Sequence, residues 1–186
     1  MGSRQRILGN AAGSMAILAV LAGVAVGLPA WDRSLPGGRL LPAGRPYRVG
    51  AGVNVIPPVG AVLDVTRTRP GTSHGSALFL IGTIRYAVVV EPFTGTLTEA
   101  AARLRTLITS THGYQVAGGD APAETVAGVP GLQGGYTTSG RAGWYAVYLH
   151  DGTVVDVTVS GTEPPLREQL PVIRASVRTV TFTGGS

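Results

Sequence analysis

Two runs rich in apolar residues, 144–150 and 153–160, are separated only by the dipeptide Asp151-Gly152. Asp-Gly readily adopts the positive φ angles that a two-residue type I′ turn requires. The pattern predicts a long antiparallel hairpin, and an isolated hairpin needs further strands or helices for stability. We therefore expect the folded part of the chain to be built around an antiparallel sheet.

Side chains alternate between the two faces of a strand, so this hairpin should have an inner and an outer face. We expect one set to line the core: Tyr145, Val147, Leu149, Val155, Val157 and Val159. Asp156 would then lie on the opposite face. Its neighbours there would be Trp144, Ala146 and Tyr148.

The face that carries Asp156 has two interpretations. If it is exposed, its aromatic and acidic side chains form a contact surface for a partner, composed of Tyr136, Trp144, Tyr148 and Asp156. If the second helix covers it, Asp156 pairs with an arginine such as Arg85 or Arg141. In αβα sandwiches, helices cover both faces of the sheet, so we favour the interpretation in which Asp156 is covered.

The first amphipathic helix is predicted over residues 96–113, from apolar residues at helical spacing. Thr96 and Glu99 fit a capping box, in which each side chain accepts from a free backbone N–H. Arg103 and Arg105 fall outside the apolar stripe, so we expect them on the solvated side.

The second helix is predicted over residues 162–177, with Pro164-Pro165 in its first turn. Pro171 predicts a kink or a restart within it. Short apolar runs bounded by glycine and proline predict further strands. These are residues 53–56, 61–66, 77–81, 84–90, 114–117, 124–126, 132–138 and 179–183, with a type II′ turn at Gly82-Thr83.

Residues 7–30 carry no charge and follow Arg4 and Arg6. Such a run can cross a bilayer as a helix, which needs about 20 apolar residues. Basic flanks stay in the cytoplasm, so the N-terminus would be inside and the following domain outside. A signal peptide cleaved after Gly27 is the alternative, and it would secrete the same domain. The length of the apolar run favours retention as an anchor in the cell membrane.

The chain then divides into four parts: a cytoplasmic arm (1–6), a transmembrane helix (7–30), a Pro- and Gly-rich stalk (31–45) and an extracytoplasmic α+β domain (46–183). The stalk is assigned because residues 31–45 show no apolar periodicity.

Composition excludes several kinds of site. The chain has no cysteine and no lysine, which removes disulfides, thiolate zinc sites, Schiff-base chemistry and Walker-type phosphate loops. The formal net charge of +5 arises mainly before residue 46, and the later arginines nearly balance the acids. A nucleic-acid binder concentrates basic charge on the domain itself, so we expect no nucleic-acid partner.

Catalytic motifs are weak. Residues 71–75 match G-x-S-x-G, but a nucleophile elbow needs a helix after Ser73, and a strand is predicted there. His74, His112 and His150 fall in or beside turns, without the spacing of metal ligands. We expect no catalytic site, metal or cofactor, and keep a serine hydrolase built on Ser73 as the least favoured alternative.

The element order resembles a known fold. A strand ending in Pro57-Pro58 is followed by strands, a helix, the turn at Gly113-Tyr114 and the run Gly128-Val129-Pro130-Gly131, and then by the hairpin at 144–160 and a C-terminal helix. This order resembles the PsbP-like αβα sandwich, shared by photosystem extrinsic subunits and actinobacterial envelope lipoproteins. It is also similar to uncharacterised membrane-anchored proteins of actinobacteria. The resemblance implies a central antiparallel sheet between two helices, and it transfers no functional residue.

The sequence thus favours a membrane-anchored, non-catalytic module that binds or assembles an envelope protein outside the cytoplasmic membrane. The alternative is a carrier of a small ligand or an envelope lipid, using a cleft between the sheet and a helix.

Overall fold

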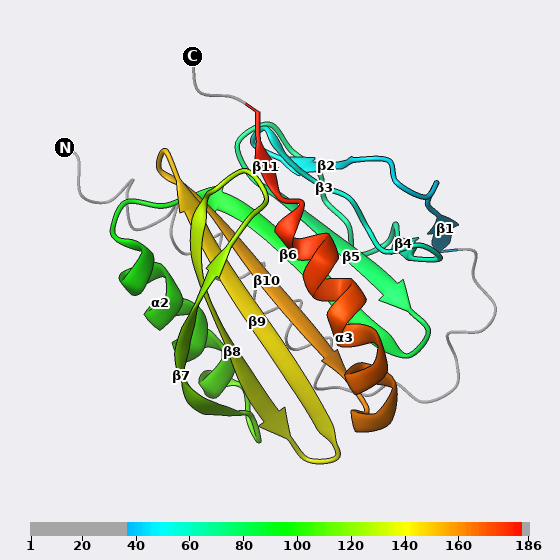
Figure 1. Cartoon of the computed structure of the whole chain (residues 1–186), viewed down its shortest axis with the longest axis vertical. Coiled ribbons are helices and arrows are strands. Elements are labelled where there is room, and N and C mark those ends of the chain that lie inside the picture. Colours follow the sequence, from blue (N-terminus) through cyan, green and yellow to red (C-terminus); the bar gives the residue numbers. More distant parts are fainter. Residues whose placement is uncertain (1–36, 184–186) are drawn as a thin grey trace.

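The computed structural model describes residues 37–183, and a large antiparallel sheet dominates them (Figure 1). Its eight strands lie in the order β1-β4-β5-β6-β10-β9-β8-β7. In chain order they are β1 (Gly38–Leu40), β4 (Val62–Asp64), β5 (Gly75–Ile81), β6 (Ile84–Pro92), β7 (Gln115–Glu124), β8 (Pro130–Thr138), β9 (Arg141–His150) and β10 (Thr153–Gly161). The expected central antiparallel sheet is confirmed.

A helix lies on each face of this sheet. The α2 helix (Leu97–Ser110) buries Leu104 and Ile108 in one apolar cluster, and the α3 helix (Glu163–Arg178) buries Ile173 and Val177 in the other. In Figure 1, α3 crosses the near face and α2 lies behind the sheet. A three-stranded sheet packs into the α3 cluster and has the order β11-β3-β2. Its strands are β2 (Tyr47–Gly50), β3 (Val53–Val55) and β11 (Thr181–Phe182).

The central hairpin has the predicted turn but not the predicted faces. Asp151 and Gly152 both have positive φ, 45° and 70°, so His150 pairs with Thr153 and Tyr148 pairs with Val155. Directly opposed residues point to the same side of an antiparallel pair. Even-numbered residues of β9 therefore share a face with odd-numbered residues of β10, and the expected grouping was wrong by one position.

Neither face of the hairpin is exposed. Trp144 and Tyr148 lie with Val157 in the cluster under α3. Tyr145 and Val147 lie in the cluster under α2. Both strands are therefore apolar on both sides, which explains why their sequences show nearly continuous apolar character rather than a clean alternation.

Local signals in both helices have the predicted form, with one exception. Thr96 and Glu99 make the reciprocal bonds of a capping box at the start of α2. In α3, Pro164 and Pro165 occupy the first turn, as expected. The helix continues through Pro171 to Arg178, so a restart at that proline was wrong.

The folded domain begins earlier than residue 46. The described part of the expected stalk, from residue 37, contains β1, whose Leu40 pairs with Val62 of β4 at the sheet edge. All three residues of β1 are exposed, so the strand is held by backbone pairing and shows no apolar pattern. The expected cytoplasmic arm (1–6), the expected transmembrane helix (7–30) and the first part of the expected stalk lie outside the described residues. Within residues 37–183, no helix is long and apolar enough to span a membrane.

Candidate functional site: a cleft between α3 and the sheet

A cavity of about 600 Å³ separates α3 from the end of the large sheet. Its walls come from three neighbouring strands, β7, β8 and β9, and from one side of α3. The lining is formed by Pro122, Ala123, Glu124, Gln133, Trp144, Tyr148, Arg167, Leu170, Pro171, Arg174, Ala175 and Arg178. Its volume lies within the range of ligand pockets, roughly 300–1,000 Å³.

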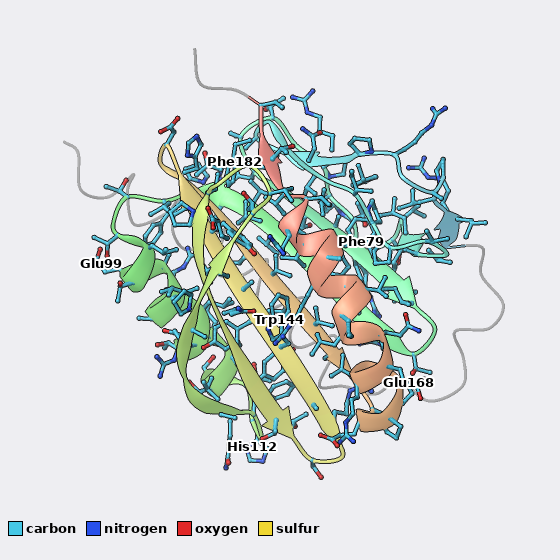
Figure 2. The ribbon with its side chains drawn as sticks, viewed as in Figure 1. Phe79, Glu99, His112, Trp144, Glu168 and Phe182 are labelled. Carbon is cyan, nitrogen blue, oxygen red and sulfur yellow. The ribbon has the colours of Figure 1, made fainter. Side chains whose placement is uncertain are left out.

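Trp144 and Tyr148 form the aromatic part of the lining. Both lie on β9 and are almost fully buried, with 4% and 1% of their surface exposed. Figure 2 shows Trp144 on the sheet beside α3. The indole N–H of Trp144 is buried and has no acceptor among the described residues. An aromatic surface of this kind can hold an apolar group.

The helix side of the cleft is basic. Arg167, Arg174 and Arg178 are spaced seven and four residues apart, which places them along one side of α3. The guanidinium of Arg174 lies over the Trp144 ring, 5.2 Å from its centroid. The charge of Arg178 counteracts the effect of burial, which raises the pKa of Tyr148. Glu124 is the one acidic residue in the lining.

The far end of α3 is tied to the opposite wall. The backbone N–H of Val126, in the turn between β7 and β8, donates to the carbonyl of Arg178 at 2.7 Å. Gln133 donates from its side-chain amide to the carbonyl of Pro122, 2.9 Å away, and thereby ties β8 to β7. The first bond joins the two walls of the cleft at this end, and the second joins neighbouring strands within one wall.

The other face of the sheet carries a buried ionic cluster under α2. Arg103 reaches two carboxylates on adjacent strands, Glu91 on β6 and Asp156 on β10. The bond to Asp156 measures 2.7 Å, and the two carboxylates are 5% and 2% exposed. Arg103 also lies 5.0 Å from the centroid of the Phe93 ring. One cation thus lies between two buried carboxyl groups.

Burial raises the pKa of the Asp156 carboxyl to about 7, although the guanidinium of Arg103 acts in the opposite direction. The nearby charge of Glu91 adds to the upward shift. Asp156 Oδ1 and Arg103 Nε are buried without a hydrogen-bond partner among the described residues. We interpret this cluster as a structural link between α2 and the sheet, because an arginine of the helix pairs with two almost fully buried carboxyl groups of the strands.

The four proposed contact residues do not form one surface. Trp144 and Tyr148 lie under α3, whereas Tyr136 and Asp156 lie under α2. Tyr136 is buried and donates from its hydroxyl to the carbonyl of Val159. An exposed aromatic and acidic strip was therefore wrong, and only Trp144 and Tyr148 contribute to the cleft.

The alternative in which a helix covers Asp156 was correct, but the helix and the arginine it named were wrong. A helix does cover Asp156, but it is α2, and its cation is Arg103 rather than Arg85 or Arg141. Arg103 is only 22% exposed, so it was wrongly assigned to the solvated side of α2. Arg105 pairs with Asp120 at 3.3 Å and is 40% exposed, closer to the expected surface position.

Ser73 does not sit on a nucleophile elbow. The residues that follow it enter strand β5, so no helix N-terminus presents its hydroxyl. Ser73 Oγ lies 3.0 Å from His74 Nδ1 in an exposed loop. His150 and Asp151 approach to 3.4 Å at the exposed hairpin end. Within residues 37–183, no group of three potential ligands could hold a metal ion.

A cleft between the sheet and a helix was expected for the carrier alternative, but the arginines that line it were not predicted, because no single one of them has a distinctive sequence context. The spacing of Arg167, Arg174 and Arg178 on a predicted helix was a usable signal for one basic stripe. Which strands face that stripe depends on the order of strands in the sheet. The order of strands in the sheet could not be predicted from the sequence.

No family model matches the chain, and no curated protein matches it in sequence. Among solved structures, it is similar to cyanobacterial PsbP (CyanoP) from Synechocystis sp. PCC 6803. That match has 13% identity and a TM-score of 0.52, and it covers 85% of this chain and 99% of the other. LpqN from Mycobacterium tuberculosis, described as involved in cell envelope biogenesis, has 12% identity and a TM-score of 0.41, with 82% and 88% covered. The chain has a PsbP-like fold, and the expected resemblance is confirmed.

Proposed function

We propose that this protein is a non-catalytic binding module that holds a small ligand in the cleft between α3 and the sheet. The observation that carries the proposal is the cleft itself, with an aromatic floor of Trp144 and Tyr148 beneath a basic helix. Of the two non-catalytic functions expected from the sequence, the ligand carrier is supported better, because the residues expected to contact a protein are buried.

Native mass spectrometry of the full chain, purified from its own membranes in a mild neutral detergent, tests this function. We expect a bound mass that is lost when Ala175, in the cleft wall, is replaced by tryptophan. Glu168→Trp is the matched control, because Glu168 is an exposed residue of the same helix outside the cleft lining. A wild-type protein with no bound mass, or a bound mass that survives Ala175→Trp, would refute the proposal.

We further propose that residues 7–30 anchor the module in the cytoplasmic membrane, with the domain outside. The support is the uncharged run behind Arg4 and Arg6. Alkaline phosphatase fused after the last residue should be active, because the enzyme needs an oxidising compartment to form its disulfides. The fusion should stay with membranes after an alkaline carbonate wash. An inactive fusion would reverse the orientation, and release by the wash would indicate cleavage.

An envelope protein partner is a second candidate. The observation that favours it is the exposure of Val126, 69% of its surface, beside the end of α3. In-cell cross-linking from position 126, followed by mass spectrometry, should give one dominant product if such a partner docks there. Cross-linking from position 126 that gives no dominant product would exclude this surface.

A further inference from the structure

The cleft has a distinct chemical character, and we propose that its ligand is an anionic amphiphile: a carboxylate or phosphate joined to an apolar body. Arg174 and Arg178 would hold the acidic group, and Trp144 and Leu170 would contact the apolar body. This inference rests on the proposed function, because it names the class of ligand that the same cleft takes.

Charge complementarity carries the first step. The lining contains three arginines and one glutamate, while arginines and acids are nearly balanced over residues 46–186. Excess positive charge is therefore concentrated at this cleft. A low-dielectric cleft with charge of one sign focuses its field on ligands of the opposite sign.

The pairing of the arginines carries the second step. Arg167 is bound to Glu163 at 3.0 Å, on the exposed side of α3. Arg174 and Arg178 make no ion pair with any residue in the described part of the chain. A guanidinium presents a planar fork of donors that matches the geometry of a carboxylate or phosphate. These two arginines, one helical turn apart, are thus available to bind one acid between them.

The apolar lining carries the third step. Leu170, Pro171 and Ala175 come from the helix, and Pro122 and Ala123 come from the strands. A free inorganic anion would leave these side chains without a contact, whereas an apolar body attached to the anion would cover them. The Trp144 ring, over which Arg174 lies, joins the basic and apolar parts of the cleft.

Trp144 also supplies the measurement. The chain has two tryptophans, Trp31 and Trp144, so in a Trp31→Phe background the fluorescence reports on the cleft alone. The full chain in nanodiscs of neutral phosphatidylcholine is titrated with octyl phosphate below its micellar concentration. Octyl glucoside supplies the same chain without charge, and inorganic phosphate supplies the charge without the chain. We expect a saturable change with octyl phosphate, and binding at least about 10-fold weaker for the other two.

The matched variants distinguish specific binding in the cleft from non-specific electrostatic attraction of the ligand to the domain. Arg174→Gln with Arg178→Gln should weaken octyl phosphate binding about 10-fold or more. Arg45→Gln with Arg48→Gln removes the same charge from exposed positions outside the cleft, and should leave the affinity within about twofold. Nanodiscs containing anionic phosphatidylglycerol distinguish the source of the ligand. A fluorescence change without added octyl phosphate would identify a lipid headgroup, and its absence would identify a soluble amphiphile.

The outcomes also separate this inference from the proposed function. Equal binding of octyl glucoside and octyl phosphate, blocked by Ala175→Trp but unaffected by the two cleft arginine substitutions, would overturn the anionic class and retain the cleft as a site. No response to any amphiphile, together with no bound mass in the native protein, would overturn both.

Discussion

Removing the charge of Arg103, the cation of the buried cluster under α2, should destabilise the protein far more than removing the charge of Arg105 on the same helix. In Arg103→Met, the carboxylates of Glu91 and Asp156 remain buried, and no cation stays between them. Methionine keeps the apolar stem of the side chain and lacks the charged guanidinium at its end. The guanidinium that lies over the Phe93 ring is lost as well.

The magnitude follows from burial. Breaking a buried ion pair by removing one partner typically costs about 3–5 kcal/mol, because an uncompensated charge remains inside. Here two carboxylates, 5% and 2% exposed, lose the same cation. For a domain of this size that loss corresponds to a decrease in Tm of roughly 10–20 °C. Protonation of the carboxylates relieves the cost, so the loss should be larger at pH 8 than at pH 5.

Arg105→Met is the control. Arg105 lies on the same helix, but its partner Asp120 is 3.3 Å away and Arg105 is 40% exposed. Exposed pairs contribute at most about 1 kcal/mol. Thermal melts followed by circular dichroism at pH 5 and pH 8 compare the two variants. Equal losses for the two, or a loss in Arg103→Met that does not depend on pH, would refute the view that Arg103 neutralises a buried pair.

Two further predictions follow from buried groups. Burial raises the pKa of Asp156 to about 7, above the value of about 4 in an unfolded chain, so the folded state binds a proton that the unfolded state has released. The free energy of unfolding should therefore fall as pH rises from about 4 to 7. In urea titrations, Asp156→Asn should flatten this dependence on pH. Asp151→Asn, on an exposed turn, should leave it unchanged. A Cβ at Gly143 would overlap the Tyr136 ring, so Gly143→Ala should cost about 1–3 kcal/mol, whereas at Gly135 the nearest atom would be 3.9 Å away. Chemical denaturation that finds Gly143→Ala as stable as Gly135→Ala would show that the close packing at Tyr136 is not required.

Local chemistry made much of the fold predictable. The capping box of Thr96 and Glu99 and the turn at Asp151-Gly152 depend on a few neighbouring residues, and both formed as expected. The antiparallel sheet and the two helices follow from apolar spacing alone. Element order then sufficed to indicate the PsbP-like fold.

The site was harder to predict, because it depends on which elements meet. The one-position error in the hairpin faces did not follow from the turn, because a two-residue turn at Asp151-Gly152 fixes the register and places Tyr148 opposite Val155. Arg103 seemed solvated because its helical position lies outside the apolar stripe. Its buried partners are far away in sequence, on β6 and β10, and only the tertiary arrangement brings them together.

The strand order has a consequence for where the ligand comes from. The chain enters the large sheet at β1, which is one edge, while the cleft lies at the other edge, against β7, β8 and β9. With neighbouring strands about 4.8 Å apart, the width of the eight-stranded sheet separates the two edges by roughly 30–35 Å, about the thickness of a bilayer's hydrocarbon core. If residues 7–30 hold the protein in the membrane and the β1 edge of the sheet lies nearest to it, the cleft at the β7 edge faces away from the lipid surface. A ligand taken directly from the bilayer would require the domain to tilt until the β7 edge of the sheet contacts the membrane.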